Sequence, residues 1–258
     1  MSSIELIKTL NQMTGAGLMT CKDALAKNDN DLDKASEWLR KEGMVKLIKK
    51  ADRIASEGIC LVKSNEKATV LLEVNCETDF VARCDEFKQY VNEIANILLD
   101  NGSQEAIDKV IANAYVRIRE KISLGKSLVI PKSKNAFVYT YTHNNNRYIS
   151  YVELDTENAE LGKQIALQVA ASNPSYINEA DVSQEELDHE YEIQKAITLN
   201  GNVKSELVDK ITANRVKAHF KELSLLPQTF LYDSSKTVEQ ALGNIKVLKI
   251  ARMKVGEK

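Results

Sequence analysis

One order of predicted elements constrains the fold most, because it occurs twice along the chain. Apolar and alternating residues on both sides of the polar turn 65–67 predict a β-hairpin over 59–74, and an amphipathic helix follows it. The same order returns over 136–154, where two strand-like runs are followed by an acidic turn and a helix through 161–169. We therefore expect an α+β fold with two related lobes, each an antiparallel sheet with helices on one face.

A small helical bundle is predicted ahead of these lobes. Apolar residues recur at helical spacing in three segments, which are separated by the glycine break 15–17 and by the polar stretch 28–31. Gly43 is expected to end the third helix. A fourth helix, from Met44 to about Ser56, is then expected to connect the bundle to the lobes.

Two polar helices are predicted as an insertion in the second lobe, over 183–223, with a break near 200–202. Each shows only a short apolar seam, so the pair is expected to protrude as a helical hairpin that contacts another surface. The chain then returns to a final strand over 245–255. The expected domains are a bundle with its linker helix (1–55), a first lobe (56–134), a second lobe (135–182 with 224–258) and the inserted hairpin (183–223).

Charge and hydropathy argue against two classes of partner. The 258 residues carry a net charge of -2, which gives no overall attraction to nucleic acid. A basic stripe over 46–53 lacks interleaved aromatic residues for base stacking, so a solvated helix face is the simpler interpretation of it. Neither an N-terminal leader pattern nor an apolar stretch of about 18 residues is present, so we expect a cytoplasmic protein without membrane contact.

The sequence offers no motif for chemistry. The four cysteines show no CxxC spacing and no nearby histidine pair, so neither a zinc site nor a redox dithiol is expected: Cys21, Cys60, Cys76 and Cys84. The tripeptide 125–127, Gly-Lys-Ser, has Glu120 where a phosphate-binding loop needs its first glycine, and it follows a predicted helix instead of a strand. We expect no metal, no cofactor, no direct nucleotide binding and no enzymatic activity.

The best candidate for a functional site is the acidic turn at 73–82 that contains Phe80. A buried apolar run precedes this turn, and Thr78 or Asp79 can cap the helix that follows. The ring of Phe80 would then be held at the edge of the protein, where it could wedge into another protein. The alternative is that Asp79 is the N-cap and that Phe80 packs back onto its own helix as a hydrophobic staple.

The string NCETDFVA at 75–82 closely resembles the signature of the elongation factor Ts family, the guanine-nucleotide exchange factors of elongation factor Tu. The segment TGAGLMTCKDAL at 14–25 resembles the N-terminal signature of that family. The segments 169–174 and 227–230 resemble two later family segments. These matches occur in family order and span nearly the whole chain.

The resemblance implies a ubiquitin-associated-like N-terminal bundle and elongation factor Tu as the partner. It also implies that Thr78, Asp79, Phe80 and Val81 intrude beside the magnesium site of that partner, with Phe80 as the wedge and Asp79 as the polar perturbant. Leu18 and Met19 are similar to the family's N-terminal contact pair, with burial of one of them in the bundle core as the alternative. In this family the inserted hairpin contributes to dimer or partner contacts, so a homodimer through it is one expectation.

Two departures from the family pattern stand out. Family members often carry a histidine in the second lobe where this chain has Gln168, so that contact would have to be made by an amide. Longer relatives add a C-terminal helical module after the last strand, and we expect none here because the sequence ends at Lys258.

Two other functions remain open from the residues alone. In one, the N-terminal bundle is an adaptor for ubiquitin-like or ribosomal partners and the rest of the chain is scaffold. In the other, Glu77 and Asp79 act as the paired carboxylates of an enzyme.

Overall fold

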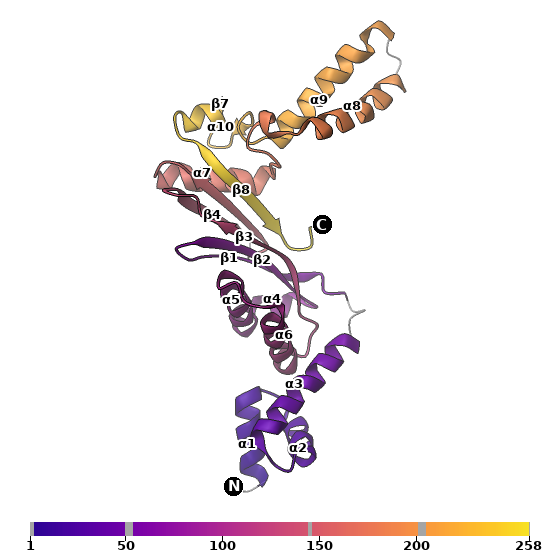
Figure 1. Cartoon of the computed structure of the whole chain (residues 1–258), viewed down its shortest axis with the longest axis vertical. Coiled ribbons are helices and arrows are strands. Elements are labelled where there is room, and N and C mark those ends of the chain that lie inside the picture. The colour runs from indigo at the N-terminus through magenta and orange to yellow at the C-terminus, as the bar shows by residue number, and fades with distance from the viewer. Residues whose placement is uncertain (1–2, 50–53, 144–145, 201–204, 258) are drawn as a thin grey trace. The chain divides into compact units, whose positions relative to one another are not determined.

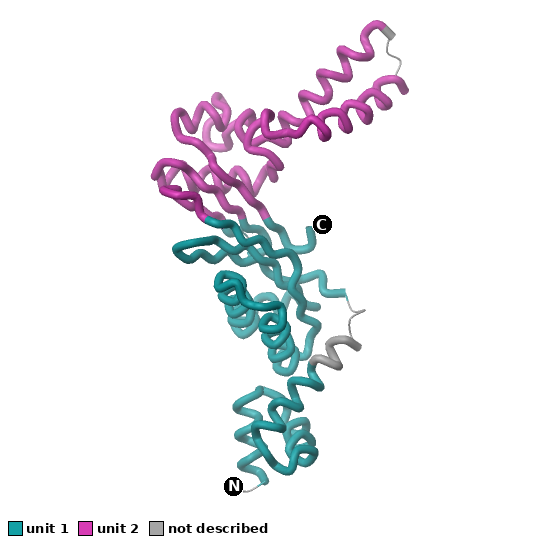
Figure 2. The backbone as a smooth tube through the Cα atoms, in the orientation of Figure 1, with its two compact units in different colours: residues 1–131, 142–149, 253–258 teal, residues 132–141, 150–252 magenta. Residues whose placement is uncertain are grey.

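The computed structural model describes residues 3–49, 54–143, 146–200 and 205–257 (Figure 1). Its chain divides into two compact units (Figure 2). The first unit holds residues 1–131, 142–149 and 253–258, and the second holds residues 132–141 and 150–252. The expected α+β class is confirmed, with N-terminal helices followed by antiparallel sheets and their helices.

The N-terminal bundle consists of α1 (Ser3–Thr14), α2 (Leu18–Lys27) and α3 (Leu32–Lys49). Its core is formed by small and aliphatic side chains that the helical periodicity placed on one face of each helix, namely Leu10, Cys21, Ala24, Leu25, Ala35 and Leu39, together with Ala16 from the turn between α1 and α2. The predicted three helices are therefore confirmed.

The expected end of the third helix at Gly43 is wrong, because α3 continues through this glycine to Lys49. Gly43 faces α6 (Gln104–Ile118) of the first lobe, and a Cβ at this position would lie 2.8 Å from Cγ2 of Val116. The glycine permits two helices to approach closely instead of ending one of them. The expectation of a separate fourth helix from Met44 is therefore wrong as far as Lys49, because these residues belong to α3. Residues 50–53 of that expected helix lie outside the described residues.

The first lobe contains an antiparallel sheet in the order β1-β2-β3, formed by β1 (Glu57–Ser64), β2 (Ala68–Cys76) and β3 (Ser123–Pro131). One face of this sheet is covered by α4 (Asp79–Arg83), α5 (Asp85–Leu99) and α6 (Figure 1). Phe87, Val91 and Ile94 of α5 are buried in the shared core. Burying each such side chain contributes roughly 1.5–3 kcal/mol, which fixes the backbone on both sides of the turn between β2 and α4.

The second lobe contains a sheet in the order β4-β5-β8, formed by β4 (Phe137–His143), β5 (Tyr148–Leu154) and β8 (Val247–Lys254). Helix α7 (Ala159–Ser172) packs Ile165 and Val169 against the buried residues of β5. The sequence analysis did not predict the small hairpin of β6 (Thr229–Phe230) and β7 (Asp233–Thr237), nor the short helix α10 (Val238–Leu242).

The predicted insertion is confirmed as a hairpin of α8 (Gln184–Leu199) and α9 (Val208–Leu223), with short 3-10 helices at Glu179–Asp181 and Ser205–Leu207. A small apolar cluster around Val182, Val216 and Phe220 packs the helices together. Four large apolar side chains of the hairpin remain exposed, namely Ile193, Ile197, Leu199 and Leu207. None of the described helices is both long enough and apolar enough to span a lipid bilayer.

Candidate protein-interaction site

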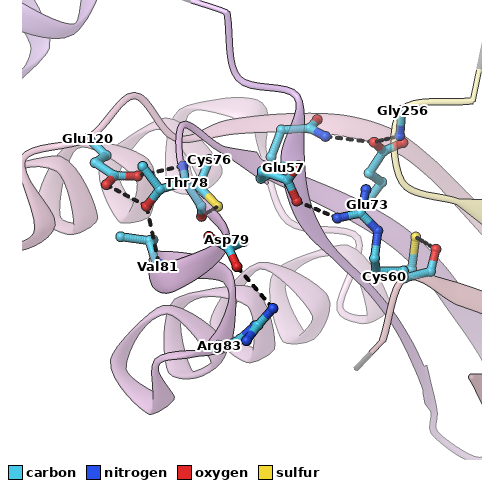
Figure 3. Close-up of polar contacts among 12 residues, drawn as sticks. Glu57, Cys60, Glu73, Cys76, Thr78, Asp79, Val81, Arg83, Glu120 and Gly256 are labelled. Carbon is cyan, nitrogen blue, oxygen red and sulfur yellow. Dashed lines mark hydrogen bonds and ion pairs between the residues drawn. The ribbon is translucent and has the colours of Figure 1, made fainter. Parts of the chain in front are cut away.

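The candidate turn joins the end of β2 to the start of α4, and Thr78 is its N-cap (Figure 3). The backbone of Thr78 is extended, with φ −127° and ψ 152°, and its Oγ1 accepts a hydrogen bond of 3.4 Å from the N–H of Val81. The alternative in which Asp79 caps the helix is therefore wrong. Thr78 satisfies one of the free N–H groups of the helix, and Asp79 occupies the first helical position.

A second set of hydrogen bonds holds the turn from the opposite side. The Glu120 carboxylate accepts hydrogen bonds from the N–H of Thr78 at 3.0 Å and from its hydroxyl at 2.8 Å (Figure 3). Oε1 of Glu77 accepts a bond of 2.7 Å from the N–H of Lys121. These bonds to ionised acceptors are stronger than bonds between neutral groups. The turn is therefore held at Thr78 through its N–H and hydroxyl, and at Glu77 through its side chain.

Phe80 is 81% exposed, although the two residues that follow it face the core. Val81 packs against the apolar cluster of the first lobe, and Ala82 is buried in it. Successive residues of a helix point about 100° apart, so a turn that buries Val81 and Ala82 directs Phe80 outward. The alternative in which Phe80 is a staple on its own helix is therefore wrong.

Asp79 forms an ion pair of 2.9 Å with Arg83, one helical turn further along α4 (Figure 3). Both side chains are largely exposed, and exposed pairs of this kind contribute no more than about 1 kcal/mol. The carboxylate can therefore exchange Arg83 for another partner at little cost.

Cys76 lies beneath the turn, and its thiol donates a hydrogen bond of 3.2 Å to the carbonyl oxygen of Thr78 (Figure 3). Burial, with a smaller contribution from the negative charge of Glu120, raises the pKa of Cys76 to about 12. The thiol is thus neutral at physiological pH and serves as a hydrogen-bond donor. None of the four cysteines is part of a disulfide bond.

Leu18 and Met19 are both exposed, at 56% and 67%. They occupy the first two positions of α2, directly after its N-cap Gly17. The alternative in which one of them belongs to the bundle core is wrong, because Cys21, Ala24 and Leu25 supply the buried face of this helix. Leu18 and Met19 therefore form an exposed apolar pair in the first unit.

Gln168 differs from its expected role as a surface contact, because it is only 2% exposed. Its amide nitrogen donates to Oε1 of Gln228 at 3.1 Å and to the carbonyl of Thr229 at 3.3 Å, and its Oε1 accepts from the N–H of Leu231 at 3.0 Å. An amide of α7 that is engaged at both ends holds the β6–β7 hairpin and is not presented to a partner.

The hairpin that Gln168 holds exposes two large side chains that the sequence analysis missed. Leu231 and Tyr232 are each 54% exposed, and they lie between Phe230 and Asp233, which pair across β6 and β7. The signal was an apolar pair directly after the segment 227–230, followed by the polar run 233–236. That pattern is a weak hairpin signal, because the two loop residues are not of the Gly, Asn or Asp type that tight turns prefer.

Three further interpretations of the sequence concern a pair of carboxylates, a phosphate-binding loop and a basic stripe. Glu77 is bound to the backbone of Lys121, while Asp79 is paired with Arg83, so the two carboxylates do not converge as those of an enzyme would. The tripeptide 125–127 lies within β3, and not in a loop between a strand and a helix. The side chains of the basic stripe over 46–53 fall outside the described side chains.

A family model described as Elongation factor TS matches residues 77–257, which is more than half of the chain. The matched range begins inside the candidate turn, at the residue before Thr78, and it includes α7, the helical hairpin and the exposed tip of the β6–β7 hairpin.

Proposed function

Since the chain belongs to the elongation factor Ts family, we propose that it binds elongation factor Tu and promotes the release of GDP, so that GTP can take its place. In this proposal the chain binds no nucleotide itself, catalyses no chemistry and acts in the cytoplasm. One observation supports the mechanism most: Phe80 is 81% exposed on a turn whose backbone is held by the Glu120 carboxylate.

An exchange factor works through differential binding. It must bind the nucleotide-free GTPase more tightly than the loaded one, and thermodynamic linkage then requires it to weaken nucleotide binding by the same factor. A rigid ring suits this task, because it fits only a form of the partner that has opened space for it. The entropy of fixing the backbone that carries the ring has already been lost in the free chain.

The ring alone is too small to account for exchange. Burying one phenylalanine contributes roughly 1.5–3 kcal/mol, whereas moving an equilibrium from 1:99 to 99:1 needs about 5.5 kcal/mol. The remainder must come from a wider interface. The exposed pairs Leu18–Met19, at the start of α2, and Leu231–Tyr232, at the tip of the β6–β7 hairpin, are suitable contributors, since both expose large side chains with apolar surface. The exposed apolar residues of the α8–α9 hairpin could add partner contacts or a homodimer contact.

Each residue of the turn would have a separate role in nucleotide exchange. Phe80 is the wedge beside the magnesium site of the partner, and Asp79 is the polar perturbant, because its pair with Arg83 is easily given up. Loosening the cation removes the charge that holds the phosphates of GDP. Thr78 and Val81 support the turn by capping and by packing, and Gln168 supports the Leu231–Tyr232 tip without touching the partner.

The test is the release of fluorescently labelled GDP from elongation factor Tu with catalytic amounts of the chain. Wild type should accelerate release, and Phe80→Ala should lower the acceleration by at least about tenfold, the loss that corresponds to roughly 1.4 kcal/mol of binding. Ile4→Ala removes another exposed apolar side chain and should match wild type. A Phe80→Ala variant as fast as wild type would contradict the wedge.

A second measurement tests the partner independently of the wedge. The chain and elongation factor Tu should elute together from a sizing column without nucleotide, and excess GDP should separate them. Separate elution in both conditions would contradict the proposed partnership.

A further inference from the structure

The last residues of α6 and the segment that follows it touch both exposed elements of the first unit. Residues 117–121 run from the final turn of α6 towards β3. Glu120 and Lys121 bind the turn that carries Phe80, while Arg117 and Arg119 lie against the glycine turn that precedes Leu18. Both contacts join residues that are far apart in the sequence, so no sequence motif predicts either of them.

The contact with the Phe80 turn is made by one side chain and one backbone group. The Glu120 carboxylate accepts from both the N–H and the hydroxyl of Thr78, at 3.0 and 2.8 Å. The N–H of Lys121 donates to Glu77 at 2.7 Å. Thr78 is the N-cap of α4, so Glu120 fixes the residue from which the helix, and with it Phe80, takes its direction.

The contact with the bundle uses the two arginines on either side of Ile118. A Cβ at Gly17 would lie 2.5 Å from Nη2 of Arg119, and a Cβ at Gly15 would lie 2.6 Å from Nε of Arg117. Both arginine side chains therefore occupy space that any larger residue of the glycine turn would need. Arg117 is held in turn by an ion pair with Glu86 of α5.

The backbone of Arg119 allows one short segment to serve both contacts. Arg119 has φ +64° in the left-handed region, and its N–H donates to the carbonyl of Tyr115 at 2.8 Å, which ends α6. The change of direction at this residue separates the arginines that face the bundle from Glu120 and Lys121, which face the Phe80 turn. Arginine at a left-handed position is uncommon and costs about 1 kcal/mol relative to glycine. Arg119 therefore occupies a backbone conformation that glycine would adopt more easily.

We propose that residues 117–121 are a positioning segment that holds Phe80 and the Leu18–Met19 pair in one frame, so that a single partner meets both at once. This inference rests on the proposed function. Two contact elements in a fixed frame bind as one unit, because engagement of the first raises the effective concentration of the second. Glu120 and Arg119 are positioning residues: neither needs to touch the partner, and each acts through an exposed apolar side chain.

A double-mutant cycle tests the Glu120 contact. Glu120→Ala should lower the acceleration of GDP release about tenfold in the wild-type chain, as expected for the loss of charge-assisted hydrogen bonds to the cap. In a Phe80→Ala chain the same substitution should change the acceleration by less than about twofold, because the ring it positions is gone. Glu105→Ala is the matched control: it removes an exposed glutamate from the first turn of α6 and should leave exchange unchanged in both backgrounds.

A second cycle tests the Arg119 contact. Arg119→Asn removes the guanidinium but keeps a residue that tolerates the left-handed backbone. It should raise the concentration of chain needed for half-maximal release about threefold, without changing the rate at saturation, because it affects docking of Leu18–Met19 and not the wedge. In a Met19→Ala chain this increase should disappear.

The outcomes separate this inference from the function on which it rests. If the wild-type chain fails to release GDP, or if Phe80→Ala matches wild type, the proposed mechanism fails and the positioning segment falls with it. If Phe80→Ala slows release but Glu120→Ala is as fast as wild type, or costs the same factor in both backgrounds, the positioning role of Glu120 is overturned while the mechanism stands. An unchanged half-maximal concentration in Arg119→Asn overturns the role of Arg119.

Discussion

The two lobes build the same turn and differ in what that turn exposes. Thr78 accepts a hydrogen bond from the N–H of Val81 at 3.4 Å, and Asn158 accepts one from the N–H of Leu161 at 3.0 Å. Val81 and Leu161 each pack against the core of their own lobe. The side-chain cap, its spacing and the apolar residue that packs on the core thus agree between the two lobes.

The residue just before the packed one differs in kind. The first lobe carries Phe80 at this position and the second carries Glu160, and both are exposed. Because the second lobe folds with a charged side chain there, the turn itself requires no aromatic ring. An exposed phenylalanine forgoes roughly 1.5–3 kcal/mol that burial would supply, so the comparison separates a scaffold common to both lobes from a contact that only one of them adds.

A buried glutamate is a further feature that the lobes share and use differently. Glu73 of β2 is 4% exposed and accepts from Asn75 at 2.6 Å and from the N–H of Gly256 at 2.8 Å. Glu153 of β5 is fully buried and accepts from the hydroxyl of Tyr151 at 3.0 Å and from Nζ of Lys249 at 3.2 Å. The first carboxylate binds neutral donors, and the second forms an ion pair.

The largest expected effect comes from making the first turn like the second. Phe80→Glu should lower the acceleration of GDP release about a hundredfold, because it removes the apolar contact and adds a charge that must be desolvated at the interface. The thermal midpoint should stay within about 2 °C of wild type, since surface substitutions rarely exceed 0.5 kcal/mol. Stopped-flow release of labelled GDP and a thermal melt measure the two quantities.

Glu160→Ala is the matched control for this substitution. It changes the equivalent exposed position of the second lobe and should alter neither exchange nor stability. Equal losses of exchange in the two variants would show that both turns, and not Phe80 alone, meet the partner.

Glu153→Gln should lower the free energy of unfolding by about 2 kcal/mol, because it breaks an ion pair within a buried network. Glu73→Gln should cost no more than about 1 kcal/mol, since both neutral donors bind the same oxygen, Oε1, and an amide oxygen there can still accept from them. Urea unfolding followed by circular dichroism gives both values. A larger loss of unfolding free energy in Glu73→Gln than in Glu153→Gln would contradict the expectation that the ion pair of Glu153 stabilises the fold more than the neutral hydrogen bonds of Glu73.

The smallest expected effect is a loss of unfolding free energy at acidic pH. Burial raises the pKa of Glu153, but hydrogen bonds from Ser133, Lys249 and Tyr151 outweigh it and leave the pKa below its ordinary value of 4.5. A carboxyl whose folded pKa is lowered contributes stability that is fully present above pH 4.5 and is lost as the pH falls through the lower value. Wild type should therefore lose stability below pH 4.5 more steeply than Glu153→Gln, as urea midpoints at pH 3 to 6 would show. Parallel profiles would contradict a lowered pKa.

The repeated hairpin, turn and helix could be predicted from sequence because their signals are local. Alternating apolar residues, polar turns and an N-cap lie within a few positions of each other in both lobes. The direction of Phe80 was open, since a cap at Thr78 and a cap at Asp79 are both compatible with the string. Choosing between them requires knowing that the distant Glu120 carboxylate accepts from both donors of Thr78 and so orients the residue whose Oγ1 caps α4.

Two of the failures share one cause, which is contact between residues distant in sequence. Gly43 resembles a helix end until α6 is placed against it, and Gln168 resembles a surface residue until the β6–β7 hairpin is placed on its amide. Neither partner can be identified from periodicity. The exposed tip at Leu231 and Tyr232 was missed for a different, local reason, because a two-residue strand is too short to show an alternating pattern.

The account depends on the ring of Phe80 being exposed in the free chain and buried against the empty GTPase. Phe80→Trp in a Trp38→Phe background places the only tryptophan of the chain at this position. Its fluorescence should be quenched by acrylamide in the free chain, protected when nucleotide-free elongation factor Tu without tryptophan is added, and quenched again after excess GDP. A tryptophan that stays equally accessible in a complex verified on a sizing column would contradict the central claim.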